Sequence, residues 1–311
     1  MNSSTRATGL LLIALSVGTL IGCGGGSSED TGTLTLGVTD APIDDATSVV
    51  VQFSGVAFKH EGQGPEIVQD LMPTPRQFNL LEYQDGRAAL LLDGVTLPAG
   101  RYEWLRLIVD NAPGVRDSYL VTSTGAECEL EVPSGAESGL KLNRGFTLPA
   151  DGSIALTVDF NLHESLRAPP GQQGSGLDCT QAVLMRPTLR VVDNANVGAI
   201  AGQVDATLVG VDCMPKVYVF SGAGATPDDI EDVTAETDVD PLIVAPVHVV
   251  SGATQYQYQA AFVPPGDYTL AFTCTDDDPT IDDTLVFSPT QNATVQPNLI
   301  TTINFAPPPP P

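Results

Sequence analysis

The sequence is poor in basic residues, histidine and aromatic residues. Its 311 residues include 13 lysines and arginines against 38 aspartates and glutamates, and the formal net charge is −25. A surface this acidic repels nucleic acid and anionic lipid, so a nucleic-acid partner is excluded. Two interpretations of the acidic surface stay open: its carboxylates are simply solvated, or they bind cations.

Catalytic motifs are equally scarce. The three histidines, His60, His163 and His248, lie far apart in the sequence. The segment HESLR, which starts at His163, begins like a zinc-protease helix, but Arg167 stands where the second histidine is required. Neither a G-x-S-x-G elbow nor a phosphate-binding loop occurs. We therefore predict that the protein is not an enzyme, and the alternative is a hydrolase whose site is assembled by folding.

The N-terminus has the pattern of a lipoprotein signal peptide. Arg6 precedes an apolar run at residues 10–17, which is shorter than the roughly 20 residues needed to span a bilayer. The run ends in Leu20-Ile21-Gly22-Cys23, which resembles a bacterial lipobox. We expect cleavage after residues 1–22 and acylation of Cys23 by lipid chains such as palmitate. The alternative is an ordinary signal peptide in which this cysteine is incidental.

Residues 23–32 are rich in glycine and serine and have no apolar periodicity, so they predict a flexible tether. Each buried methylene favours membrane association by about 0.8 kcal/mol, so several acyl chains anchor the chain firmly. Resemblance to Gram-negative lipoproteins adds that Gly24, which is not aspartate, favours the outer membrane. The expected location is the cell envelope, with the membrane as one partner and an envelope protein or glycan as another.

Four cysteines remain once Cys23 is acylated, and an oxidising compartment favours disulfides. Three pairings are open. We predict Cys128–Cys179 and Cys213–Cys274, because each pair then stays inside one predicted domain. Each bond closes a loop of roughly 50 to 60 residues, which contributes about 4 kcal/mol on the chain-entropy model. No two of these cysteines have C-x-x-C spacing, so a zinc site is not expected.

Short apolar runs of valine, threonine and leucine between glycine and proline turns predict an all-β fold. We expect two β-sandwich domains of immunoglobulin-like or prealbumin-like type behind the lipidated flexible tether. They span residues 33–193 and 199–305, and a polyproline tail follows at 306–311. The predicted strands are residues 33–38, 48–58, 77–83, 88–92, 103–109, 119–122, 140–142, 153–160, 182–192, 199–204, 216–220, 255–263, 268–272 and 299–305.

Two turns share one design. The segments Leu97–Tyr102 and Pro264–Leu270 each place proline and glycine before a tyrosine that opens a strand. Trp104, the single tryptophan, lies two residues into the first of these strands among apolar neighbours. We interpret it as a core or sandwich-edge residue, and the alternative is a platform for a ligand.

Two turns gather carboxylates. The clusters are Asp40, Asp44 and Asp45, and Asp276, Asp277 and Asp278, which follow Cys274. Hard cations such as Ca²⁺ bind loop oxygens of this kind, but neither cluster has EF-hand spacing. The alternatives are solvated turns and, for Asp40, capping of the turn backbone. We therefore expect no obligatory cofactor, with Ca²⁺ as the one candidate.

The segment from Thr33 to about Val192 resembles a family of bacterial lipoproteins called domain of unknown function 4382. The matching features are Thr39-Asp40-Ala41-Pro42, Asn79-Leu80-Leu81, Leu97–Tyr102 and Val158-Asp159-Phe160. That family has no assigned activity.

The chain from Ala199 resembles β-sandwich modules of the carboxypeptidase-regulatory or transthyretin-like kind, through Ile200–Val204 and Pro264–Leu270. Such modules stabilise, space or bind. We therefore predict a membrane-anchored envelope lipoprotein with a non-catalytic binding or structural role. The alternative binding role is that of an adhesin-like surface protein that recognises Ca²⁺ or carbohydrate.

Overall fold

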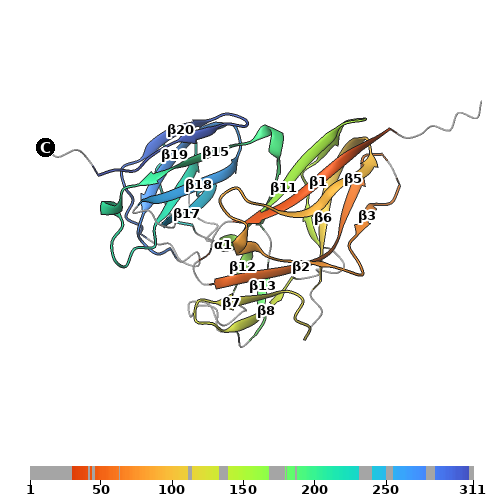
Figure 1. The fold of residues 1–311 in the computed structure, drawn as a ribbon, viewed down its shortest axis with the longest axis horizontal. Coiled ribbons are helices and arrows are strands. Elements are labelled where there is room, and N and C mark those ends of the chain that lie inside the picture. Colours follow the sequence, from red (N-terminus) through yellow and green to blue (C-terminus); the bar gives the residue numbers. More distant parts are fainter. Residues whose placement is uncertain are drawn as a thin grey trace, which may run out of the picture.

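A computed structural model gives the fold of the chain (Figure 1). It describes residues 30–40, 43, 46–62, 64–110, 114–132, 139–167, 179, 181–185, 188–230, 240–249, 255–277 and 284–307. Strands dominate these ranges, and the one α-helix is the four-residue α1 (Leu162–Ser165). The all-β prediction is therefore confirmed. None of the helices in the described ranges combines the length and the apolar character needed to cross a membrane.

The smaller sheet of the first domain has four strands in the order β14-β11-β1-β5. Their bounds are β1 (Thr31–Asp40), β5 (Ala89–Pro98), β11 (Ser153–Asn161) and β14 (Thr188–Asp193). The central pair, β1 and β11, runs parallel, and the outer strands are antiparallel to it. Parallel pairing brings the carboxyl ends of β1 and β11 to the same edge of the sheet.

The larger sheet follows the order β10-β6-β2-β7-β8-β13-β12, and β3, β4 and β9 pair beside this path. The strand bounds are β2 (Ala46–His60), β3 (Ile67–Asp70), β4 (Arg76–Asn79), β6 (Gly100–Asp110), β7 (Tyr119–Thr122), β8 (Glu127–Glu131), β9 (Leu140–Leu142), β10 (Phe146–Leu148), β12 (Leu166–Arg167) and β13 (Val183–Met185). A short 3₁₀ helix, η1 (Leu80–Glu82), follows β4.

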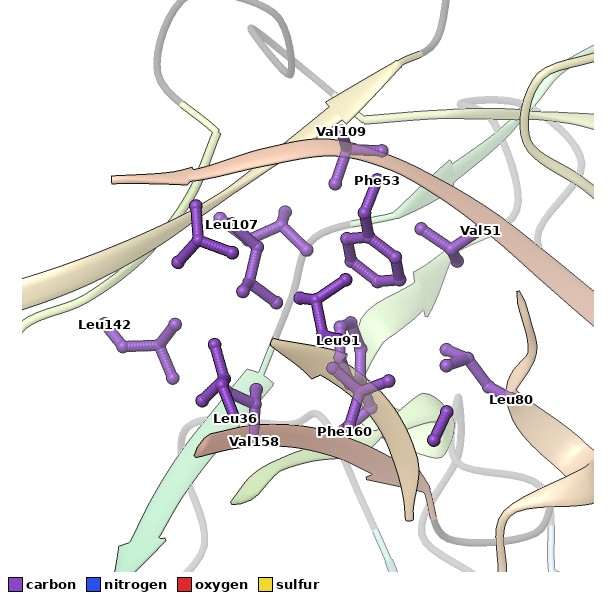
Figure 2. Close-up of a cluster of buried hydrophobic side chains, with 14 of the residues drawn as sticks. Leu36, Val51, Phe53, Leu80, Leu91, Leu107, Val109, Leu142, Val158 and Phe160 are labelled. Carbon is purple, nitrogen blue, oxygen red and sulfur yellow. The ribbon is translucent and has the colours of Figure 1, made fainter. Parts of the chain in front are cut away.

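The core of the first domain lies between these two sheets (Figure 2). Leu36, Val158 and Phe160 come from β1 and β11, and they face Phe53 and Val109 on the larger sheet. The rings of Phe53 and Phe160 meet edge to face, with centroids 6.4 Å apart. The alternation of buried and exposed residues along these strands is what places one face of each sheet in this core.

The second domain is a seven-stranded sheet in the order β20-β19-β16-β17-β18-β15-β21. The bounds are β15 (Gly198–Val204), β16 (Lys216–Ser221), β17 (Ile243–Val249), β18 (Tyr256–Val263), β19 (Gly266–Thr273), β20 (Gln291–Val295) and β21 (Ile300–Thr302). The hydroxyl of Thr301 on β21 donates to the carbonyl of Thr294 on β20, at 2.7 Å. The two ends of the sheet therefore meet, and the curled sheet encloses its own apolar core.

The repeated proline–glycine–tyrosine turns form the same hydrogen bond in both domains. Tyr102 donates its hydroxyl to the carbonyl of Pro98, and Tyr268 donates to Pro264, each at 2.7 Å. This is the geometry of a tyrosine corner, which fixes the entry of a strand. Burial raises the pKa of Tyr102 to about 12, so this hydroxyl stays protonated and keeps donating.

Each domain is closed by its own disulfide. Cys128 is bonded to Cys179, and Cys213 is bonded to Cys274, with sequence separations of 51 and 61 residues. This is the pairing that the sequence predicts.

Some details differ from the expectations. The predicted strand at 182–192 is two strands in different sheets, because β13 joins β8 and β14 joins β11. Of the two positions expected for Trp104, core or sandwich edge, the core is wrong, because its strand turns Leu105 and Leu107 inward. Trp104 is half-buried on the outer face, where the Lys141 ammonium lies 4.6 Å from its ring centroid.

Candidate functional site

The functional candidate is the junction where the two domains meet. A cavity of about 60 Å³ lies there, between Asp40, Asp85 and Asp159 of the first domain and Leu242 and Val244 of the second. An open groove and a hollow of about 300 Å³ adjoin the same junction. Carboxylates in this position are unusual, because a charge that loses water is costly unless it is paired.

The carboxyl ends of β1 and β11 bring two of these carboxylates together. Thr39 is opposite Asp159 in the parallel register, and Asp40 is buried, with 6% of its surface exposed. The hydroxyl of Thr39 lies 2.7 Å from the carbonyl of Tyr83 and 2.8 Å from that of Arg87. The hydroxyl of Thr39 therefore holds both ends of the turn after η1, Tyr83 and Arg87, against the end of β1.

Asp159 is neutralised by an arginine on the neighbouring strand. The two residues are opposite each other in the antiparallel register of β11 and β14, and Nη2 of Arg190 lies 2.5 Å from Oδ2 of Asp159. Only 20% of the arginine side chain and 18% of the aspartate side chain is exposed. Burial raises the pKa of Asp159, and the guanidinium opposes that rise.

A hydrogen bond between two side chains crosses from one domain to the other. Nε2 of His248 on β17 lies 2.8 Å from Oδ2 of Asp85. The hydrogen bond to this carboxylate raises the pKa of His248, and partial burial opposes the rise. Gly86 has a φ of 81°, and a Cβ there would lie 2.8 Å from Nε2 of Gln259. The turn therefore needs glycine both for its backbone and for its close approach to β18.

A fourth carboxylate, Asp277, is buried inside the second domain, and its hydrogen-bond partner Ile230 also lines the junction cavity. Tyr218 donates its hydroxyl to Oδ2 of Asp277 at 2.5 Å, and the backbone N–H of Ile230 donates to the same oxygen at 3.2 Å. Burial raises the pKa of Asp277 to about 6, although both hydrogen bonds oppose the change. Lys216 and Asp229 are buried nearby as part of the same charged cluster.

The residues predicted as metal ligands are not brought together as predicted. Asp40 lies at the junction, and Asp276 and Asp277 lie in the second domain, where Oδ1 of Asp276 accepts from the backbone N–H of Asp277. Asp44, Asp45 and Asp278 are outside the described residues, as is the lipidation candidate Cys23. Within the described ranges, no group of three or more histidine, cysteine, aspartate or glutamate side chains could hold a metal ion. The two cation sites stay predictions.

Sequence reasoning missed Asp85, Asp159, Arg190 and His248 as site residues. They come from a turn and three separate strands, and no motif links them. The pair of His248 and Asp85 has the chemistry of a base and its orienting group. Among the described residues, no serine or cysteine lines the groove in which the pair lies. The arrangement as described orients a histidine but presents no serine or cysteine nucleophile.

Comparison with known protein families finds a match to most of the first domain. Residues 31–177 match the family described as domain of unknown function (DUF4382). The resemblance that the sequence suggested is therefore confirmed for this part of the chain. No curated protein matches the chain.

Several solved structures are similar to the chain at low identity. A leucine-rich repeat protein from Bacteroides thetaiotaomicron is 13% identical, with a TM-score of 0.23, and the match covers 88% of this chain and 26% of that protein. The TIE protein of Bacillus anthracis is 10% identical, with a TM-score of 0.20, 88% of this chain covered and 34% of that one. An adhesin candidate from Bacteroides ovatus is 11% identical, with a TM-score of 0.20, 97% of this chain covered and 100% of that one. The chain thus spans about a quarter and a third of the length of the first two, and no function is carried over from them.

Proposed function

We propose that this protein is a lipid-anchored component of the bacterial cell envelope with a non-catalytic binding or structural role. The observation that carries the proposal is that each all-β domain is closed by a disulfide of its own. Stable disulfides of this kind form in oxidising compartments outside the cytoplasm. The lipobox ending in Cys23 supplies the means of staying at the membrane after export.

The charged groups at the junction support a binding or structural role over catalysis. Arg190 holds one oxygen of Asp159, and His248 holds one oxygen of Asp85, so each carboxylate has a partner within the protein. A general base in an enzyme must instead be within reach of a substrate proton. The pair of His248 and Asp85 links the two domains, and the pair of Arg190 and Asp159 links β14 to β11 within the first domain.

Mass spectrometry of the native protein, extracted from envelope membranes, tests the anchor. We expect a chain that begins at Cys23 and carries the mass of its acyl chains. The matched variant Cys23→Ser removes only the acylated thiol and should release the protein from the membrane fraction, with both disulfides intact. A native chain that starts at Met1 with a free thiol at Cys23 would refute the proposal.

The sorting prediction has its own test. Gly24→Asp should move the protein from the outer to the inner membrane on a density gradient without changing its acylation. An unchanged distribution would refute outer-membrane sorting by this residue and leave the anchor itself intact.

A further inference from the structure

The single tryptophan lies among cations on the outer face of the first domain. The Lys141 ammonium is 4.6 Å from the ring centroid of Trp104, and the guanidinium carbon of Arg106 is 6.0 Å from it. Lys59 on β2 is opposite Trp104 in the register with β6. Three of the 13 basic residues in the chain thus surround one ring.

Apolar side chains extend this surface. Phe58 and Leu107 point into the core, so the residues next to them along β2 and β6 face outward. Ile108 on β6 is half-buried there, and Val68 on β3, opposite the outward-facing Ala57, has 46% of its surface exposed. We call this surface the tryptophan patch. Its members are Lys59, Val68, Trp104, Arg106, Ile108 and Lys141.

The charges of the tryptophan patch and its surroundings nearly balance. Glu66 lies 2.6 Å from Arg106 and neutralises it. The exposed side chains near the patch that form no ion pair among the described residues are Lys141, Arg144, Asp70 and Glu103. Charges farther away than about 8 Å are largely screened at physiological salt, so this face is close to neutral although the chain as a whole is strongly acidic. It is therefore a face that a phospholipid surface repels little.

The patch shares a strand with the point where the chain enters the first domain. The backbone N–H of Ala99 donates to the carbonyl of Asp30 at 2.7 Å, and β6 begins at the next residue, Gly100. Trp104 follows about 13 Å along that strand. The tryptophan patch is therefore fixed close to the start of β1.

An acylated Cys23 keeps this end of the first domain near the bilayer. The chain from Cys23 to Asp30 spans at most about 25 Å, even when fully extended. Asp40, at the junction, lies at the other end of β1, about 30 Å from Thr31. Figure 1 shows the second domain beyond that far end of β1. The patch thus lies in the half of the protein that the anchor holds at the membrane.

We propose that the tryptophan patch docks on the phospholipid surface that holds the anchor. Tryptophan suits the boundary of a bilayer, because its ring is apolar and its N–H is polar. Lys141 and Arg144 can donate to lipid phosphates, and Glu103 can accept from the ammonium groups of ethanolamine lipids. An anchored protein meets this surface at a high effective concentration, so contacts too weak to bind a free protein suffice to orient it. The inference rests on the proposed lipid anchor, and it adds which face of the protein meets the membrane.

Fluorescence of the full-length acylated protein tests the proposal, because Trp104 is its one tryptophan. The protein is reconstituted in vesicles of phosphatidylethanolamine with about one quarter phosphatidylglycerol, with and without lipids brominated near the headgroup. We expect brominated lipid to quench Trp104 and the vesicle surface to shield it from acrylamide. Lys141→Gln/Arg144→Gln should lower the ratio of docked to undocked protein about 25-fold, since each cation near an anionic surface contributes about fivefold.

Arg76→Gln/Arg116→Gln is the matched control, because it removes two cations outside the patch, on β4 and before β7. This control should be quenched as the native protein is, and thermal unfolding shows whether the variants are folded. Absence of quenching in the native acylated protein, or equal quenching in the folded patch variant, would overturn the proposal. Shielding of Trp104 that needs an envelope protein in place of lipid would also overturn it. Mass spectrometry of the same sample measures the acylation of Cys23, so failure of the patch and failure of the anchor are distinguishable.

Discussion

Replacing Arg190 with methionine removes the guanidinium that faces Asp159 between β14 and β11. The carboxylate then remains in a site where only 18% of its side chain is exposed, without its partner at 2.5 Å. Methionine keeps much of the length and the apolar stem of arginine, so packing changes little. The variant thus isolates the electrostatic part of the interaction.

The expected loss is about 3 kcal/mol. Breaking a buried ion pair by removing one partner costs roughly 3–5 kcal/mol, and the lower end applies because Asp159 and Arg190 each retain some exposure. For a domain of this size, 1 kcal/mol corresponds to a shift in Tm of about 2–4 °C. Differential scanning calorimetry should therefore show the transition of the first domain falling by about 6–12 °C.

The stability lost in Arg190→Met depends on pH. Burial already raises the pKa of Asp159 above its ordinary value, and loss of Arg190 raises it further. In the folded variant, the carboxyl group of Asp159 then holds its proton more tightly than it does in the unfolded chain. The destabilisation should be largest near pH 7, where the carboxyl is ionised when unfolded, and should shrink as the pH approaches about 4.

A matched control uses an exposed ion pair. Arg101 lies 3.5 Å from Glu61, with 68% and 57% of the two side chains exposed. Arg101→Met should cost less than about 1 kcal/mol at any pH. If Arg190→Met costs no more than this control, or costs the same at pH 7 and at about pH 4, the buried pair does not stabilise the first domain in this way.

The second domain yields three further predictions. Tyr268→Phe loses the hydrogen bond to Pro264 and should lower the free energy of unfolding by about 1 kcal/mol in urea titrations, whereas no change would contradict the tyrosine corner. Asp277 has its pKa raised from 3.8 to about 6, so its contribution to stability should be lost as the pH rises through 6, and Asp277→Asn should flatten that dependence in calorimetry. Cys213→Ser/Cys274→Ser should lower stability by about 4 kcal/mol, since the bond closes a loop with a sequence separation of 61 residues, and a Tm unchanged from the native protein would count against it.

Local alternation was sufficient to predict most strands. The segment that forms β6 alternates between buried Leu105, Leu107 and Val109 and less buried residues, as its sequence pattern indicates. β17 was missed because Pro246 interrupts its apolar run, and proline is unusual inside a sheet. Proline is accommodated there opposite Lys216, because residues in an antiparallel pair alternate between hydrogen-bonded and non-bonded positions.

The junction site could not be predicted in the same way. Alternation specifies which face of a strand is buried, but it does not specify which strands are neighbours or that β1 and β11 run parallel. Asp159 and Arg190 meet only because β11 and β14 pair, and His248 meets Asp85 only when two domains pack together. The pairing of the cysteines could be predicted from the sequence, because only one of the three possible pairings keeps each disulfide inside one domain.

The junction is a stable feature of the fold because the domains are tied at two separate places. The connection η2 (Asn194–Asn196) follows β14 directly, and the side chain of Asn298 donates to the carbonyl of Ala195 at 2.9 Å, which fixes this connection to the second domain. The pair of His248 and Asp85 forms the other tie, on β17. A hinge that bends freely needs one flexible connection and no second contact. Two contacts at separate places restrict such bending, so Asp85 is held in place beside His248 at the junction.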